Sequence, residues 1–399
     1  MNILYTNSEF LLSQRKRCSL NSKMGGNLSS DLKSSKYRKR EIVDLRKMEI
    51  DKLPPTIGAL LCKELLLAEN DLTTLPEEIG KLSNVQVLDV SKNRITSIPL
   101  EIEELSHMVS LTELDLKVNP PLSYVPSLAN LRQLKKLSIR NLQISHLPMG
   151  VGLLSELQEL DMRDNPQLKE VPYDIGTLIN LQRLDLFGNN MRIIPREIGN
   201  LINLQSLDLR QNQLLIDNIP QELGRLVNLK KLSLSGNRLV ALPAEVCTLT
   251  NLKELECANN QLQALPNEIG QLVALTKVNF SANKLTTLPA SIGDLVELQL
   301  ADFKSNEIAD LPETLGGWKN VTKIDLSHNM LTELPWELGQ LEGTLTILDV
   351  GHNPLTIPPN PIVIKGTEAI VQWLKKNEKE GRKGKVSGLE IQQDDDKKK

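Results

Sequence analysis

Charged side chains recur at a fixed interval along this chain, and they are its clearest candidates for binding chemistry. One column of mostly acidic or small polar residues repeats at intervals of about 23 residues: Asp44, Leu66, Asp89, Asp115, Ser138, Asp161, Asp185, Asp208, Ser233, Glu256, Asn279, Asp302, Asp325 and Asp349. In the middle of the chain a second column follows two residues later: Lys117, Arg140, Arg163, Phe187 and Arg210. Residues two apart on a strand share one face. The sequence therefore predicts an acidic stripe beside a basic one, with an exposed Phe187 among them.

Arginine and aromatic residues dominate the energetics of protein interfaces. We therefore predict a partner-binding surface made of Asp115, Lys117, Arg140, Asp161, Arg163, Arg183, Asp185, Phe187, Asp208 and Arg210. The alternative is an ordinary solvated face on which acids and bases neutralise one another, because exposed ion pairs each contribute little.

No motif of a catalytic site accompanies these columns. The chain has no P-loop, no Gly-rich phosphate loop and no His or Cys residues at metal-binding spacing. His328 and His352 hold the same place in successive repeats, so a metal site or a pH sensor is an alternative to two solvated side chains. Lys277–Phe280 matches a short docking motif for protein phosphatase 1, but its Val278 and Phe280 fall at core positions. We expect no enzyme activity, no metal and no cofactor.

The residues at 181–201, LQRLDLFGNNMRIIPREIGNL, show which elements must position the charged columns. Leu184 and Leu186 alternate with polar residues, which predicts a short half-buried strand. Pro195 has a fixed φ at a place where a helical turn can begin. Gly199 is then expected to close that turn in a left-handed conformation. Such a unit cannot bury its own apolar face and needs a copy on each side.

The chain supplies those copies. An Asn recurs in steps of mostly 23 or 24 residues, and fourteen of the 21 prolines fall in the same phase. This is a leucine-rich repeat pattern of 23 residues. It predicts an α/β fold, a right-handed solenoid or horseshoe with a parallel sheet on the concave side and short helical turns on the convex side. The Asn side chain has both donor and acceptor atoms, so we expect it to form a ladder between repeats.

The repeats divide the chain into three parts. Residues 1–41 are expected to be a disordered basic tail, residues 42–376 one solenoid of fourteen repeats, and residues 377–399 a disordered charged tail. Residues 367–376 read as a capping helix, with Thr367 as its N-cap. Two steps are irregular: one of 26 residues around Glu101–Met108, and one of 25 with Asp217 and Asn218 inserted.

The N-terminal part contains a pattern for lipidation. Residues 24–29, Met-Gly-Gly-Asn-Leu-Ser, fit N-myristoylation with Gly25 as the acceptor, provided that translation starts at Met24. One acyl chain binds membranes weakly, and a basic cluster is the usual second signal. Such a cluster follows: Lys33, Lys36, Arg38, Lys39 and Arg40. The alternative is a coincidental match of a short pattern.

Composition narrows the partners further. The net charge is −3 and aromatic residues make up 3% of the chain, so we expect no nucleic acid. The four cysteines form no paired cap of the kind that extracellular repeat proteins carry, which favours a reducing, cytoplasmic setting. The sequence has no run of 18 apolar residues that could span a membrane.

The LPxEIGxL repeats resemble the intracellular Ras-group leucine-rich repeat proteins, of the Shoc-2/Sur-8 kind. The flanks MGGNLSS, KYRKREIVDLRK and VQWLKKNEKEGRKGKVSGL, and LDLFGNNMR in the middle, resemble leucine-rich repeat proteins of social amoebae over residues 24 to about 393. The first resemblance implies a scaffold for Ras-type GTPase signalling. The second implies a role in actin remodelling and cell movement.

Together these observations predict a monomeric, non-enzymatic scaffold that binds a signalling protein on the concave face. The partner implied is a Ras-type small GTPase or its effector, and the location is the cytoplasm, with peripheral contact to the inner face of the plasma membrane through the acyl chain. The alternative is the sensor arm of a larger repeat-containing GTPase or kinase, because the NPxxxxKGTEAIVQWL ending resembles segments that precede such domains. That the chain ends at Lys399 favours the scaffold.

Overall fold

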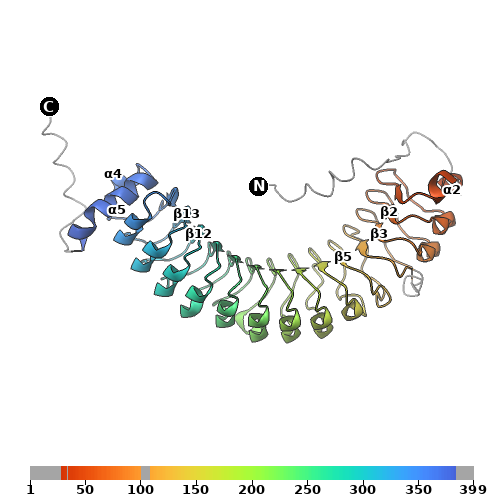
Figure 1. The fold of residues 1–399 in the computed structure, drawn as a ribbon, viewed down its shortest axis with the longest axis horizontal. Coiled ribbons are helices and arrows are strands. Elements are labelled where there is room, and N and C mark those ends of the chain that lie inside the picture. The colour runs from red at the N-terminus through yellow and green to blue at the C-terminus, as the bar shows by residue number, and fades with distance from the viewer. Residues whose placement is uncertain (1–27, 34, 100–107, 383–399) are drawn as a thin grey trace, which may run out of the picture. The chain divides into compact units, whose positions relative to one another are not determined.

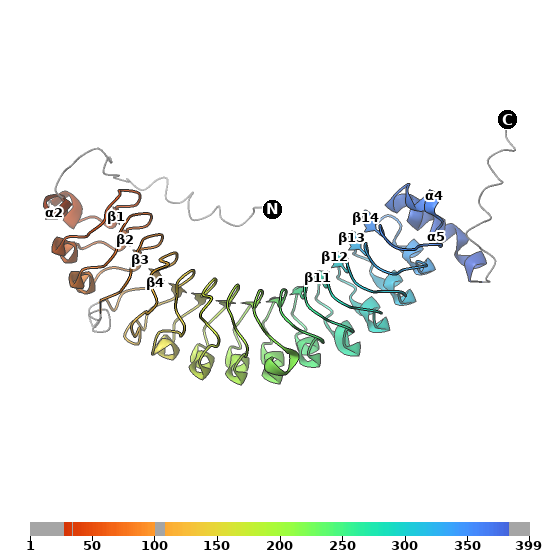
Figure 2. The ribbon, with the colours of Figure 1, turned by 180° about the vertical axis from the view of Figure 1, so that it is seen from behind.

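The protein is seen in a computed structural model that describes residues 28–33, 35–99 and 108–382. The chain forms two compact units, Met1–Leu168 and Lys169–Lys399. Within each unit, short parallel strands line one side and 3₁₀ helices line the opposite side (Figure 1; Figure 2 gives the view from behind). We call the side on which the strands lie the strand face of that unit.

The first unit has six described strands, each paired in parallel with the next along the chain. They are β1 (Ile42–Asp44), β2 (Glu64–Leu66), β3 (Val87–Asp89), β4 (Glu113–Asp115), β5 (Lys136–Ser138) and β6 (Glu159–Asp161). The described 3₁₀ helices of this unit are η2 (Pro55–Ala59), η3 (Glu77–Lys81) and η5 (Val151–Leu153).

The second unit has eight strands, again paired in parallel in chain order. They are β7 (Arg183–Asp185), β8 (Ser206–Asp208), β9 (Lys231–Ser233), β10 (Glu254–Glu256), β11 (Lys277–Asn279), β12 (Leu300–Asp302), β13 (Lys323–Asp325) and β14 (Ile347–Asp349). Its 3₁₀ helices are η6 (Tyr173–Thr177), η7 (Arg196–Asn200), η8 (Ile216–Asn218), η9 (Gln221–Arg225), η10 (Ala244–Thr248), η11 (Asn267–Gln271), η12 (Ala290–Asp294), η13 (Glu313–Gly317) and η14 (Trp336–Leu341). The predicted solenoid of short strands and helical turns is confirmed.

Each short strand has a buried apolar residue at its centre and is followed directly by a second one. Leu184 and Leu186, for example, are fully buried. In the second unit the core also contains a stack of aromatic rings, with Phe280 and Phe303 5.8 Å apart and Phe303 and Trp318 6.4 Å apart between centroids. Aromatic pairs at such distances add to the free energy of burial.

Where a repeat has the ladder Asn, that side chain joins the repeat to the preceding one. Asn70 accepts a hydrogen bond through Oδ1 from the Met48 N–H at 2.9 Å, and its Nδ2 donates to the carbonyl oxygens of Leu45 at 2.9 Å and Leu67 at 2.8 Å. The side chain therefore satisfies backbone groups of its own repeat and of the preceding one. The expected ladder is present, but the Asn70 side chain bonds to the preceding repeat, whereas the sequence predicted bonds to the next one.

Gly199 corrects one expectation. It lies inside η7, and it is not among the residues with positive φ. Its role is spatial, because a Cβ at this position would lie 2.5 Å from the Glu222 carbonyl oxygen of the next repeat. Glycine is needed here for close packing of successive turns, and the left-handed closure that the sequence predicted is wrong.

The expected disordered tail through residue 41 is also wrong for its last part. Residues Leu28–Lys33 form α2 and Ser35–Arg38 form α3. Leu32 and Tyr37 are buried, and α2 packs against η2. These helices cover apolar surface that the first repeat would otherwise expose. Gly25 and Met24 lie outside the described residues, as do residues 100–107 of the 26-residue step.

At the other end, α4 (Asn360–Val363) and α5 (Thr367–Gly381) close the second unit. Helix α5 continues past residue 376, where the sequence predicted its end. Arg382, directly after the helix, forms ion pairs with Glu378, at 3.0 Å, and with Glu337. Gly366 is the N-cap, and Thr367 instead accepts a hydrogen bond from the Leu348 N–H at 2.8 Å.

Candidate functional site

Five of the predicted binding residues line one groove on the strand face of the first unit. This groove encloses about 430 Å³ along β2 to β6. The five are Asp115, Lys117, Arg140, Asp161 and Arg163. The sequence therefore places these side chains correctly on a common surface.

The acidic column has a structural role that the sequence analysis missed. The Oδ1 atom of Asp161, the last residue of β6, accepts a hydrogen bond from the backbone N–H of Arg163 at 3.2 Å. The Asp89, Asp115 and Asp302 side chains accept the same bond from the residue two positions later. Such bonds hold the chain in a turn at the end of a strand.

The same carboxylates also hold the basic column in place. Arg163 donates to Asp161 from Nε at 2.9 Å and from Nη2 at 2.7 Å. Asp44 holds Arg46 at the same two distances, and Asp115 pairs with Lys117. We call this pairing of a strand-end acid with the base two residues later a clamp. A clamped base is already neutralised, so it offers less to a partner.

Arg140 is the exception. Ser138 occupies the position of the acid in β5, so no carboxylate clamps Arg140. The Arg140 Nε and the Ser138 Oγ are both buried, and neither has a hydrogen-bond partner among the described residues. Buried polar atoms are nearly always paired, and leaving one unpaired costs about 1–3 kcal/mol. The structure thus brings one unclamped cation and one free hydroxyl into the groove.

The charges that surround Arg140 are mostly engaged. Lys136 pairs with Glu113 at 3.3 Å, in addition to the clamps on Lys117 and Arg163. Burial raises the pKa of Asp115 above its usual value, although Lys117 acts in the opposite direction. This groove therefore contains a largely self-neutralised surface on which Arg140 is the one basic lining residue without a described ion pair.

The predicted residues of the second unit form a separate cluster on its own strand face. Asp208 clamps Arg210 through Nε at 2.9 Å, and the Arg210 guanidinium lies 5.3 Å from the centroid of the Phe187 ring. Phe187 is half-buried and Asp185 and Asp208 are buried, so the expected exposure of Phe187 is wrong. The cause is the cation–π contact and the packing of adjacent strand ends. Arg183 is exposed.

Glu256 is the centre of this cluster, and the sequence analysis left it out of the predicted surface. Its carboxylate lies 2.8 Å from Lys277 Nζ, 3.8 Å from Arg210 Nη1 and 4.0 Å from Lys231 Nζ. Its side chain is only 12% exposed. Burial raises the pKa of Glu256, but the hydrogen bond from Lys277 and the nearby cations lower it further, so the net shift is downward.

Some missed residues had a signal in the sequence. Ser138–Arg140 is the only pair in which a base of the second column follows a residue that is not acidic. Reading the two columns together would have identified the unclamped arginine. Glu256 offered no such signal, because Lys231 and Lys277 come from the start of neighbouring strands.

Two other candidates gain no functional support. The rings of His328 and His352 are stacked with centroids 4.1 Å apart, but the described residues contain no group of three or more His, Cys, Asp or Glu that could hold a metal ion. Val278 and Phe280 are buried, which agrees with the core interpretation of that motif. No helix within the described ranges is long and apolar enough to cross a membrane.

Known proteins share this architecture. Models for "Leucine-rich repeat region" match residues 114–234 and 196–282, and models for "Leucine rich repeat" match residues 62–120 and 320–341. The leucine-rich repeat protein lrrA of Dictyostelium discoideum is 87% identical over 62 residues. That match spans 16% of this chain and 12% of the relative, a much shorter stretch than the expected residues 24–393.

Solved structures cover far more of the chain. A leucine-rich repeat protein of Leptospira interrogans is 30% identical, covers 85% of this chain and 96% of its own, and has a TM-score of 0.66. The plant peptide hormone receptor RGFR1, in complex with RGF2, is 30% identical with a TM-score of 0.55; the match covers 76% of this chain and 57% of the receptor. With the repeated strands and the Asn ladder, these likenesses show that the chain belongs to the leucine-rich repeat proteins.

Proposed function

We propose that this chain is a non-enzymatic protein-interaction module whose first unit binds a partner on its strand face, at Arg140. The observation that carries this proposal is the unclamped Arg140 beside the free Ser138 hydroxyl. An acidic side chain of a partner could accept hydrogen bonds from both groups, provided that the buried Nε and Oγ atoms turn toward it. Hydrogen bonds to charged groups contribute more than neutral ones.

A carboxylate suits this place better than a phosphate. The groove contains five acidic side chains, Asp89, Glu113, Asp115, Glu159 and Asp161, and four basic ones, Lys117, Lys136, Arg140 and Arg163. Its net charge is therefore −1, which repels a doubly charged group more than a single charge. A protein partner is also supported by a relative of this fold, the plant peptide hormone receptor solved in complex with RGF2.

The test uses two opposite changes at the same point. Arg140→Gln removes the cation, whereas Ser138→Asp supplies the missing acid and clamps the arginine. Both variants should lose the main partner in affinity purification with mass spectrometry, with affinity lowered at least about tenfold. Circular dichroism should show an intact fold.

Matched controls are available in the same unit. Arg132→Gln and Ser83→Asp make the same changes of charge at exposed positions outside the groove, and they should keep the partner. If all four variants retain the same proteins, the Arg140 surface is not the binding site. If only the Arg132→Gln and Ser83→Asp variants lose the partner, the partner binds another surface.

The finer assignment follows from the resemblances. We propose a scaffold in intracellular signalling, with a Ras-type small GTPase or its effector as the partner and a role in actin remodelling and cell motility. The short match to lrrA supports a relationship to that protein. Binding of purified chain to GTP-loaded and GDP-loaded Ras-type GTPases tests the assignment, and absence of binding to both forms would contradict it.

The lipid anchor remains part of this proposal. If Met24 starts the chain in cells, Gly25 should carry myristate, and Gly25→Ala should move the protein from membranes to the cytoplasm. Mass spectrometry of the N-terminus checks this directly. A peptide that begins at Met1 would contradict it.

A further inference from the structure

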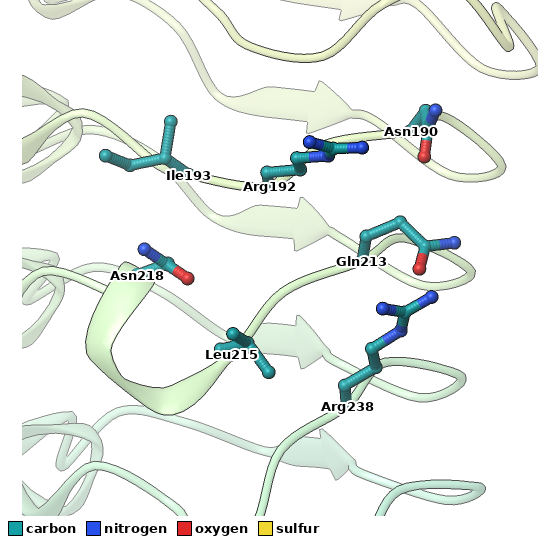
Figure 3. Close-up of a pocket in the computed structure, with 7 residues that line it drawn as sticks. All are labelled: Asn190, Arg192, Ile193, Gln213, Leu215, Asn218 and Arg238. Carbon is teal, nitrogen blue, oxygen red and sulfur yellow. The ribbon is translucent and has the colours of Figure 1, made fainter.

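The second unit has another groove, which lies beside the turns that follow β7, β8 and β9. It encloses about 670 Å³ and shares no lining residue with the charged clusters of the strand face. Figure 3 shows its residues on successive turns of the solenoid, with the polar ends of Arg192, Gln213 and Arg238 at one side and Ile193 and Leu215 at the other. Backbone hydrogen bonds from Gln213 to Met191 at 2.9 Å and from Arg238 to Leu214 at 3.0 Å keep these turns in register.

The two-residue insertion shapes this groove. In regular repeats the backbone N–H of one turn bonds to the carbonyl of the turn before it, as Gln263 does to Val240 at 3.1 Å and Ala309 to Thr286 at 3.2 Å. Here the inserted residues form η8, and the Ile194 N–H donates to the Asn218 carbonyl of the following repeat at 3.1 Å. Asn218 thereby becomes part of the groove wall.

The polar side of the groove has binding capacity that the chain itself does not use. Arg192 and Arg238 are exposed, and neither forms an ion pair with a described residue. Between them the Oε1 atom of Gln213 is buried and accepts no hydrogen bond in the described structure. Two unpaired cations call for an acid, and a buried unpaired acceptor calls for an N–H donor.

The other side of the groove is apolar. Ile193 is 47% exposed and Leu215 is 49% exposed. Large apolar side chains rimmed by polar residues are typical of interaction sites. A ligand that covered both would remove apolar surface from water.

We propose that this groove binds an extended peptide segment of a protein partner, with an Asp or Glu side chain between Arg192 and Arg238 and an apolar side chain on Ile193 and Leu215. A backbone N–H of the peptide donates to the Gln213 Oε1 once that side chain turns from its buried position toward the peptide. This requirement favours a peptide over a phosphate, which at neutral pH offers mainly acceptors. The proposal does not rest on the Arg140 surface, because the groove lies in the other unit.

The experiment is a selection of random peptides displayed on phage against the immobilised full chain. The expected consensus is an acidic residue within two positions of Leu, Ile or Phe. The best peptide is then made with a fluorescent label, and its affinity is measured by anisotropy. The Arg192→Gln/Arg238→Gln variant should bind it at least about tenfold more weakly, as should a peptide with its acid changed to the amide.

The control is Arg196→Gln/Arg225→Gln, which removes two exposed arginines from η7 and η9 and should bind the peptide as the wild type does. Gln213→Leu should also weaken binding, because it removes the acceptor. A selection without an acidic consensus overturns the proposal. So does equal affinity for the Arg192/Arg238 variant, or displacement of the peptide by inorganic phosphate at constant ionic strength.

Discussion

Asn283 reaches from its own repeat to the one before it, where its Oδ1 accepts a hydrogen bond from the Leu262 N–H at 3.1 Å. Its Nδ2 donates to the carbonyl oxygens of Cys257 at 3.0 Å and Phe280 at 2.9 Å. Asn283 is buried, so water cannot replace these bonds. One side chain thus pairs three backbone groups that would otherwise be unsatisfied.

Asn283→Ala should therefore lower the free energy of unfolding by roughly 1–3 kcal/mol, the cost of unpaired buried groups. Asn267, exposed at the start of η11, is the matched control, and Asn267→Ala should be close to neutral. Urea denaturation of the two variants measures the difference. Equal midpoints would reject the ladder as a source of stability.

The sequence predicts the repeat architecture well because one pattern is repeated. The leucines of the strands, the ladder Asn and the Pro before a 3₁₀ helix occur in the same order along the chain. A repeat that departs from the pattern can therefore still be assigned from the repeats beside it. The repetition does not decide the role of Gly199. A glycine before a turn and a glycine at a close approach look the same in sequence, and only the Glu222 carbonyl at 2.5 Å from its would-be Cβ decides between them.

The sequence predicted where the charged side chains lie, but not which of them already pair with one another. The spacing places Asp161 and Arg163 on one face, yet it does not say that the acid already caps the turn and clamps the base. Contacts such as that of Glu256 with Lys231 and Lys277 join different repeats and depend on side-chain reach. Helix α2 was missed because its apolar pattern is a single pair, Leu28 and Leu32, next to a run of basic residues.

The capping helix α5 should be essential to the end of the second unit. Leu374 is fully buried against the last repeat, and Trp373 stacks on Trp336 with ring centroids 5.7 Å apart. Leu374→Ala should cost about 2–5 kcal/mol, as large-to-small changes in cores do. Lys376→Ala, at an exposed position of the same helix, should change stability little. Hydrogen exchange of β13 and β14 checks this, and equal protection in both variants would show that the cap is dispensable.

The described cysteines should react slowly with alkylating agents in the folded protein. Burial raises the pKa of the Cys62 thiol to about 11 and that of Cys247 to about 12, and it raises the pKa of Cys257 as well. The thiolate is the reactive form. Alkylation by iodoacetamide at pH 8 should therefore be slow at all three residues and become fast in urea. Peptide mass spectrometry resolves each site, and rapid labelling of Cys257 in buffer would contradict its burial.

Glu256 should make the second unit sensitive to acid. Although burial alone raises its pKa, Lys277, Lys231 and Arg210 lower it below the usual value. A carboxyl group with a lowered folded-state pKa contributes stability above its unfolded pKa, near 4.3, and that contribution is lost as the pH falls through the folded-state pKa.

Glu256→Gln should thus cost roughly 1–3 kcal/mol at neutral pH, and the difference from the wild type should shrink below about pH 4. The control is Glu254→Gln, which removes a partly exposed carboxylate 3.0 Å from Lys231 and should cost less than about 1 kcal/mol. Urea denaturation from pH 3 to pH 8 measures both variants. A difference that grows on acidification would mean that the charged form of Glu256 does not stabilise the fold.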